Sequence, residues 1–223
     1  QKFNYNFNYL IKVMRYLKYL IVPIIAMSII VLISNILVQF LLGNWLTWGA
    51  LTYPFAFLVT DLTNRFYGLT AARKVVLFGF IIGIFCSLIG TQLQSEFGPL
   101  VTLRIALGSA TAFILSQFID ISIFNSLRKE KWWKAPLISS ILGSLLDTII
   151  FFFIAFSSFF IFLEPLNDVS WAAEHNPVLG LVGSAPFWVS LAIADFLVKL
   201  SIISISLIPF RYFILFLKIK ENI

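Results

Sequence analysis

The stretch APLISSILGSLLDTIIFFFIAFSSFFIFL, residues 135–163, contains a single charged side chain, Asp147. A helix needs about 20 predominantly apolar residues to cross the hydrocarbon core of a bilayer, and this stretch is longer than that. Strands of a membrane β-barrel alternate apolar and polar residues over about 10 positions, a pattern that this stretch does not follow. It therefore predicts a membrane-spanning helix that tilts or extends beyond the bilayer.

The composition of the whole chain agrees with this class. Of its 223 residues, 60% are hydrophobic and only 12% are charged, and the mean hydropathy is +0.97. A soluble domain is about 45–50% apolar and about 25% charged. Because helices satisfy their own backbone polar groups inside a bilayer, the sequence predicts an all-α integral membrane protein.

Apolar runs divide the chain into a regular pattern. We expect a six-transmembrane-helix bundle over residues 20–210, preceded by a cytoplasmic juxtamembrane segment, 1–19, and followed by a cytoplasmic basic tail, 211–223. Pro54 lies near the start of the second run, where proline is tolerated. The six runs are 20–42, 51–68, 75–94, 104–127, 135–163 and 184–208.

Basic residues alternate with acidic ones from one connection to the next. Clusters such as Arg73–Lys74 and the RKEKWWK loop, 128–134, flank one end of the runs, whereas Glu164, Asp168 and Glu174 lie at the other. Basic loops remain in the cytoplasm, so both termini are predicted to be cytoplasmic. The net charge of +6 then follows from topology, and no nucleic-acid partner is expected.

Several kinds of protein chemistry lack the residues they need. The chain has one cysteine, Cys86, and one histidine, His175, which is too few for a haem or zinc site built from several such ligands. It has no phosphate-binding loop of the GxxxxGK[ST] kind. We therefore expect neither an enzyme nor a metal or other cofactor.

Six ionisable side chains fall well inside the apolar runs. Each costs about 2.5–3.5 kcal/mol at the centre of a membrane helix, so they are expected to face one another or a water-filled cavity. Intramembrane charges of this kind favour transport of a small polar solute over an open channel. These side chains are Asp61, Arg65, Asp120, Asp147, Asp195 and Lys199.

The spacing of these charges allows two interpretations. Asp61 and Arg65, like Asp195 and Lys199, are four residues apart and share a helix face, so each pair can neutralise itself. Asp120 and Asp147 have no base within one turn and are expected to pair across helices with Arg65 or Lys199, or to take part in function. The most economical arrangement turns four polar stripes inward around one site.

Three motifs carry a resemblance that covers about residues 20 to 210. LTYPFAFLVTDLTNRFYGLTAARKVV (51–76), SQFIDISIFNSLRK (116–129) and GSLLDTIIFFFIAF (143–156) resemble the queuosine-precursor transporter family, also called the vitamin-uptake transporter family. The resemblance implies a six-helix protein of the bacterial inner membrane, with an architecture similar to the substrate-binding subunits of energy-coupling-factor transporters. It also implies import of 7-cyano- or 7-aminomethyl-7-deazaguanine, or of queuine.

A 7-deazaguanine ligand would suit the inward stripes. One carboxylate accepts its ring N–H and exocyclic amine together, a fork that we assign to Asp147 or Asp61. Aromatic stacking adds about 1–3 kcal/mol per base. The remaining candidates are Asn64, Gln92 and Gln117 as polar partners; Phe57, Phe151 and Trp188 as stacking groups; Arg65 and Lys199, with Asp195, as balancing charges; and Asp120 as an inner gate or proton group.

Two other functions fit the same sequence. One is a substrate-binding subunit that requires a separate ATPase module, although docking in that class often uses an AxxxA pair, and here Ala26 is followed four residues later by Ile30. The other is a membrane assembly factor that transports nothing. The sequence leaves open which precursor is bound, which ion drives transport and how many subunits assemble.

Overall fold

The computed structural model describes residues 2–43, 45–95, 98–165 and 168–221 and is mostly helical. Five helices of this described part are long and apolar enough to cross a bilayer, so the chain is a multi-pass membrane protein. They are α1 (Lys2–Leu37), α4 (Leu69–Gln92), α5 (Leu103–Leu127), α6 (Lys134–Phe156) and α8 (Phe187–Glu221).

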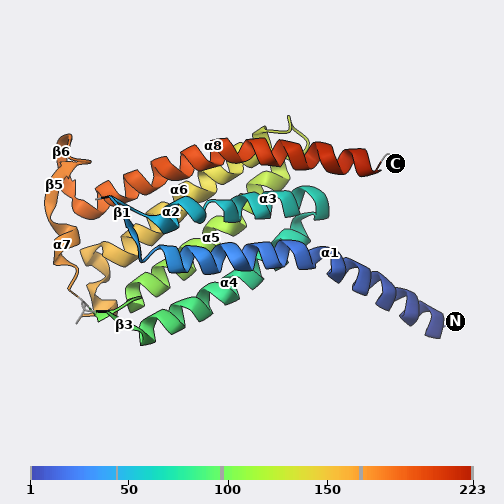
Figure 1. Cartoon of the computed structure of the whole chain (residues 1–223), viewed down its shortest axis with the longest axis horizontal. Helices are drawn as coiled ribbons and strands as arrows, with labels where there is room; N and C mark the ends of the chain where they lie inside the picture. The colour runs from blue at the N-terminus through green and yellow to red at the C-terminus, as the bar shows by residue number, and fades with distance from the viewer. Residues whose placement is uncertain (1, 44, 96–97, 166–167, 222–223) are drawn as a thin grey trace.

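The five long helices run side by side along the long axis of the molecule, with both termini at the same end (Figure 1). The opposite end carries short elements, among them three antiparallel two-stranded ladders. These elements are β1 (Leu41–Leu42) with β2 (Leu46–Thr47), β3 (Gln94–Ser95) with β4 (Gly98–Pro99), the 3-10 helix η1 (Ser158–Leu163), α7 (Ser170–Ala173), and β5 (His175–Val178) with β6 (Val182–Pro186).

The second predicted span is not one continuous helix. It consists of α2 (Trp48–Thr52) and α3 (Phe55–Tyr67), separated at Tyr53 and Pro54. Proline has no N–H to donate to the helical ladder. After it, the amides of Ala56 and Phe57 bond to carbonyls only three residues back, at 3.0 and 3.1 Å. The expectation that Pro54 would be tolerated without interruption is therefore wrong.

The fifth predicted span, 135–163, is also shorter than the apolar run suggests. Helix α6 ends at Phe156, Ser157 is extended, and η1 follows. Arg104 of α5, which is fully buried, binds the end of this helix: its Nε lies 3.3 Å from the Ile154 carbonyl oxygen and its Nη2 lies 2.5 Å from that of Ser157. Helix ends leave unpaired carbonyls, and a buried guanidinium satisfies two of them here.

Helices α3, α5 and α6 meet closely at Gly143. A Cβ atom at this position would lie 2.8 Å from Cε1 of Phe57 and 3.1 Å from Cβ of Asp120. Small residues allow membrane helices to approach one another in this way. The contact brings the polar faces of the three helices together.

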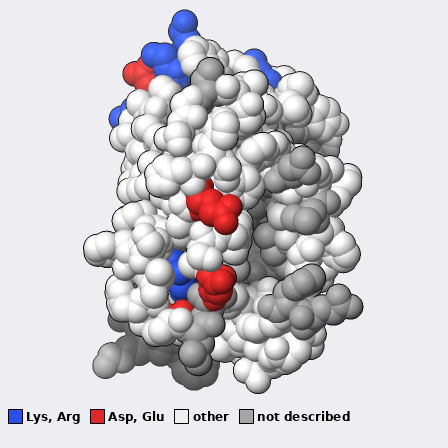
Figure 2. All heavy atoms as spheres, turned by 90° about the vertical axis from the view of Figure 1, so that its left-hand side faces the viewer, with Lys and Arg blue, Asp and Glu red and all other residues white. Residues whose placement is uncertain are grey.

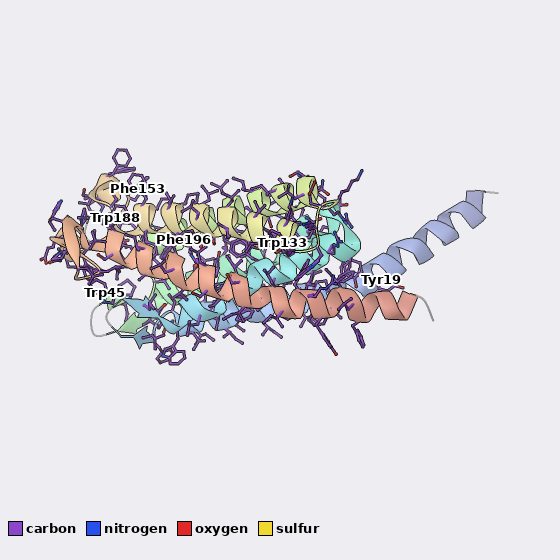
Figure 3. The ribbon with its side chains drawn as sticks, turned by 90° about the horizontal axis from the view of Figure 1, so that it is seen from above. Tyr19, Trp45, Trp133, Phe153, Trp188 and Phe196 are labelled. Carbon is purple, nitrogen blue, oxygen red and sulfur yellow. The ribbon has the colours of Figure 1, made fainter. Side chains whose placement is uncertain are left out.

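The distribution of exposed side chains is that of a membrane bundle. Large apolar residues point outward, including Phe85 at 59% exposure and Ile208 at 72%. Trp45, Phe153 and Trp188 lie toward the end of the bundle opposite the termini, and Tyr19 lies toward the end that carries them (Figure 3). Aromatic residues are enriched at both membrane interfaces, so this placement agrees with a bundle that crosses a bilayer.

Candidate functional site

The four intramembrane acids all point into the bundle. Asp61 is 2% exposed, Asp120 0% and Asp147 4%, and Asp195 is half-buried. The sequence predicted one shared site. The structure instead places the four acids in two neighbouring hydrogen-bonded groups. We call them the Lys199 cluster (Tyr53, Ser116, Asp147, Thr148, Asp195 and Lys199) and the carboxyl pair (Asp61 and Asp120, with Ser139 and Ser140).

Lys199 holds the first group together from α8. Its Nζ lies 2.7 Å from Asp147 Oδ2 on α6 and 2.6 Å from Asp195 Oδ2, one turn earlier on its own helix. Thr148 Oγ1 accepts a hydrogen bond from this ammonium at 2.9 Å and donates one to Asp195 at 2.8 Å. The predicted pairing of Asp195 with Lys199 is confirmed, and Asp147 obtains its base across helices, as one alternative required.

The other oxygen of Asp147 accepts donors from two further helices. The Tyr53 hydroxyl lies 3.1 Å from Asp147 Oδ1, and the Ser116 hydroxyl lies 3.3 Å from it. The Tyr53 ring also faces Lys199, with Nζ 5.6 Å from its centroid, and packs edge-on against Phe113 at 6.1 Å. Sequence reasoning missed Tyr53; the available signal was Pro54, because a proline disfavours helical backbone in the residue before it.

The second group contains two carboxyls and no base. Ser140 Oγ lies 3.0 Å from Asp61 Oδ2 and 3.4 Å from Asp120 Oδ1, and Ser139 Oγ lies 3.4 Å from Asp61 Oδ1. The hydroxyl of Ser140 therefore bridges the two carboxyl groups. Within the described residues neither of them forms an ion pair with Lys or Arg.

The predicted pairing of Asp61 with Arg65 is wrong. Arg65 Nη1 instead donates to the carbonyl oxygen of Arg128 at 2.7 Å, and Arg128 Nη2 donates to that of Arg65 at 2.7 Å. The end of α5 carries partial negative charge and unpaired carbonyls, which attract the guanidinium away from its own helix. Gly68, with φ of +85°, makes the adjacent turn from α3 into α4.

Asn64 and Gln117 link α3 to α5 beside the carboxyl pair. Thr60 Oγ1 donates to Gln117 Oε1 at 2.6 Å, and Asn64 Nδ2 donates to the Ile121 carbonyl at 3.1 Å. All of these side chains are fully buried. Asn64 Oδ1 and Gln117 Nε2 have no protein partner in the described part of the chain, so this layer retains one free acceptor and one free donor.

The remaining candidates lie at various distances from the acids. Phe57 is buried against Gly143, next to Asp120. Phe151 lies one turn beyond Asp147, and its ring centroid is 5.1 Å from that of Phe152. The ring centroid of Trp188 is 6.4 Å from that of Phe153, near the end of the bundle opposite the termini (Figure 3).

Gln92 is not with the other candidates. It is exposed at the end of α4, with its amide 3.5 Å from the hydroxyl of Thr91.

A small cavity of about 10 Å³ lies beside the carboxyl pair. Asp61, Ser140 and Ser206 provide its polar lining, with Phe57 and Phe210 among its apolar walls. A volume of this size holds roughly one water molecule. With Asp61, Asp120 and Asp147 at most 4% exposed, these three acids are closed off from solvent in this structure.

Fold and site together define a class. An apolar helical bundle that gathers ionisable side chains from several helices in its interior is a multi-pass membrane protein with an intramembrane polar centre, the usual mark of a functional pathway. The family described as "Putative vitamin uptake transporter" matches residues 47–214. The chain belongs to this family, as the sequence motifs predicted.

Relatives with assigned names support the same grouping. The chain is 34% identical over 190 residues to the "Queuosine precursor transporter" of Escherichia coli, covering 79% of this chain and 77% of that one. It is 36% identical over 174 residues to the "Probable queuosine precursor transporter" of Haemophilus influenzae, covering 73% and 66% respectively. A Bacillus subtilis protein of the same name as the latter is 29% identical over 192 residues, covering 77% and 72%.

No solved structure matches the chain. The architectural similarity to energy-coupling-factor subunits therefore stays a prediction.

Proposed function

We propose that this protein carries a queuosine precursor across the bacterial inner membrane. Its relatives are named for queuosine precursors, and the family resemblance of the sequence implies that these are 7-deazaguanines. The Lys199 cluster is the proposed binding site, because a buried carboxylate accepts hydrogen bonds there from several helices. The substrate is 7-cyano- or 7-aminomethyl-7-deazaguanine, or queuine.

Asp147 is our candidate for reading the base edge. In the closed structure its Oδ2 accepts from Lys199 and its Oδ1 accepts from Tyr53 and Ser116, so both oxygens are engaged by protein donors. A 7-deazaguanine offers two adjacent N–H donors that would replace these contacts in a bidentate arrangement. Lys199 would keep Asp195 and Thr148 as partners, so no buried charge is left alone when the ligand enters.

The aromatic groups beside Asp147 would hold the flat face of the base. Tyr53 and Phe113 lie against the cluster itself and are better placed for stacking than Phe151 and Trp188. Phe151 lies one turn after Asp147 and Trp188 about two turns before Asp195 in sequence, so we place both rings on the outer path to the site.

Transport requires the bundle to open, since the cavity beside the acids holds roughly one water. We propose six crossings over residues 20–210, with α2 and α3 together making the interrupted one. Discontinuous helices are frequent at transporter binding sites. The segments 1–19 and 211–223 would lie in the cytoplasm, and the acidic side chains visible on the opposite end (Figure 2) would face outward.

Uptake by proteoliposomes that contain only this chain tests the proposal. We expect accumulation of radiolabelled 7-cyano- or 7-aminomethyl-7-deazaguanine, and loss of it in Asp147→Asn, whose amide cannot accept on both sides. Asp168→Asn is the matched control, because Asp168 is exposed in the loop that precedes α7. Uptake that needs an added ATPase module, or that is normal in Asp147→Asn, would contradict the proposal or this site.

Binding supplies a second measurement. A ligand at 100 times its dissociation constant adds about 2.7 kcal/mol to the stability of the folded state. We expect a rise in the thermal unfolding midpoint with deazaguanines and none with unrelated vitamins. The absence of any saturable binding would favour the assembly-factor alternative.

A further inference from the structure

The carboxyl pair has none of the charge compensation that Lys199 gives its neighbours. Asp61 and Asp120 are 2% and 0% exposed, and the hydroxyl of Ser140 contacts both of them. Two adjacent buried carboxyls cannot both ionise without a cation, because each charge opposes the other. The pair therefore needs a positive charge. This charge comes either from a basic side chain nearby or from a cation bound from solution.

On the helices packed around the pair, the described basic side chains either bind other groups or are exposed at the surface. Arg65 of α3 and Arg128 after α5 bind each other's carbonyls. Arg73 and Lys74 of α4 are exposed, and residues 20–37 of α1 contain no Asp, Glu, Lys or Arg.

The remaining charges are those of α6 and α8. Lys134 pairs with Glu130 at 3.1 Å, Lys199 is held by Asp147 and Asp195, and Arg211 stacks on Trp132 at 4.8 Å. Arg104 of α5 binds the carbonyls of Ile154 and Ser157. None of the basic side chains that the structure describes on these helices forms an ion pair with the carboxyl pair.

Two polar atoms at this place have no protein partner. Asp120 Oδ2 is buried and unbonded among the described residues, and so is the hydroxyl of Ser206 on α8. Ser206, 8% exposed, lines the same cavity as Asp61 and Ser140. An unpaired buried hydroxyl facing a water-sized cavity beside a carboxyl indicates that something small and polar binds there.

The contacts of the pair favour a proton over a metal cation. Ser140 has one hydroxyl hydrogen but contacts an oxygen of each carboxyl, at 3.0 and 3.4 Å. A hydrogen on one of the carboxyls would let both contacts form as separate two-centre hydrogen bonds. Among the described residues no third Asp, Glu, His or Cys joins the pair, so a metal cation would lack a further ligand of these kinds.

We propose that Asp61 and Asp120 share one bound proton, that the Ser206 cavity connects the pair to solvent through a water molecule, and that this proton site couples a proton gradient to transport. The proton enters from the outer solution onto a carboxylate oxygen and leaves to the cytoplasm as the bundle changes between its open forms, so charge and atoms balance. The coupling role rests on the proposed transport function, but the shared proton does not.

Infrared difference spectroscopy of the purified protein tests the proton directly. We expect a carboxylic-acid C=O band at neutral pH that shifts in D₂O, changes in frequency in Asp61→Asn and in Asp120→Asn, and disappears when both residues are replaced by Asn. Asp168→Asn is the control: the backbone N–H of Ser170 binds Asp168 at 2.9 Å and holds the pKa of that carboxyl below its usual range, so it contributes no such band. Absence of the band in the unmodified protein would overturn the proposal, whatever the protein transports.

Proteoliposomes test the coupling. An inward proton gradient is expected to drive uptake of radiolabelled 7-cyano- or 7-aminomethyl-7-deazaguanine, whereas a sodium gradient is not. Asp61→Asn and Asp120→Asn should abolish this gradient-driven uptake while retaining ligand-induced thermal shifts and exchange of internal for external substrate. Retained binding shows that these variants are folded, so the loss cannot be assigned to misfolding.

The outcomes separate this inference from the proposed function. Uptake that follows a sodium gradient, or proton-driven uptake that persists in both variants, would overturn the coupling while leaving the transport function intact. A band that is present and lost as expected, in a protein that neither binds nor transports deazaguanines, would support the proton site and contradict the proposed function.

Discussion

Two neighbouring groups in this bundle bury the same kind of side chain and neutralise it differently. In the Lys199 cluster two carboxylates share one ammonium at 2.7 and 2.6 Å. In the carboxyl pair, Asp61 and Asp120 meet two serine hydroxyls and no described base. The first group keeps its compensating charge permanently; the second can take its charge from solution. The difference suggests a fixed binding site beside a site that is loaded and unloaded.

Removing Lys199 should change the free energy of unfolding more than any change in the carboxyl pair. Breaking a buried ion pair by deleting one partner costs about 3–5 kcal/mol, because the other charge remains buried alone. Lys199→Met leaves two such carboxylates, so we expect a loss in the free energy of unfolding of about that size. The measurement is chemical unfolding in mixed detergent micelles.

Lys134→Met is the matched control for this change. Lys134 pairs with Glu130 in an exposed loop, and surface pairs contribute about 0–1 kcal/mol. Asp61→Asn should also change the free energy of unfolding far less than Lys199→Met, since it removes a charge without leaving an opposite one unpaired. Similar losses in all three variants would remove the distinction between the groups.

Separating the helices should disturb the carboxyl pair before the Lys199 cluster. Gly143→Ala places a Cβ 2.8 Å from Phe57 Cε1 and 3.1 Å from Asp120 Cβ, and overpacking of this kind costs about 1–3 kcal/mol. Gly83→Ala is the control, since its nearest neighbour, Val31 Cγ1, lies at an ordinary 3.6 Å. The thermal unfolding midpoint should fall in Gly143→Ala and stay unchanged in Gly83→Ala. No difference between them would mean that the close contact at Gly143 is not rigid.

Removing one hydroxyl should weaken the Lys199 cluster modestly. Tyr53→Phe keeps the ring beside Lys199 but deletes the donor to Asp147 Oδ1. Because Ser116 still contacts that oxygen at 3.3 Å, we expect a loss in the free energy of unfolding of about 1 kcal/mol. Tyr212→Phe, at a ring 64% exposed, should have no measurable effect. An equal effect at both positions would argue against the bond to Asp147.

The sharpest test of pairing compares two coupling free energies, of which the smaller is expected to be close to zero. Asp61 with Arg65 and Asp195 with Lys199 have the same sequence spacing, but only the second pair is in contact. A double-mutant cycle on Asp195 and Lys199 should give a coupling free energy of about 0.5–3 kcal/mol, and one on Asp61 and Arg65 less than about 0.5 kcal/mol. Comparable couplings would mean that Arg65 turns back to Asp61 in the membrane.

Much of this arrangement can be predicted from particular residues. A run such as 135–163 specifies a membrane helix because a bilayer accepts few other structures. Asp61, Asp120, Asp147 and Asp195 were predicted to face inward because hydrocarbon penalises them. Gln92 and Arg65 were misplaced, since a polar side chain near the end of a helix can also be satisfied by solvent or by another helix's carbonyls, as both are here.

The sequence by itself determined the membrane class, the apolar runs and the identity of the buried charges, because each depends on transfer free energies that a single residue carries. Only the tertiary structure decided which charges meet: Lys199 with Asp147, Arg65 with the Arg128 carbonyl, and Asp61 with Asp120 through Ser140. It also decided that Pro54 interrupts its helix and brings Tyr53 to the cluster. The physical reason is that pairing depends on distances between helices, which are set by close contacts such as the one at Gly143 and not by spacing along the chain.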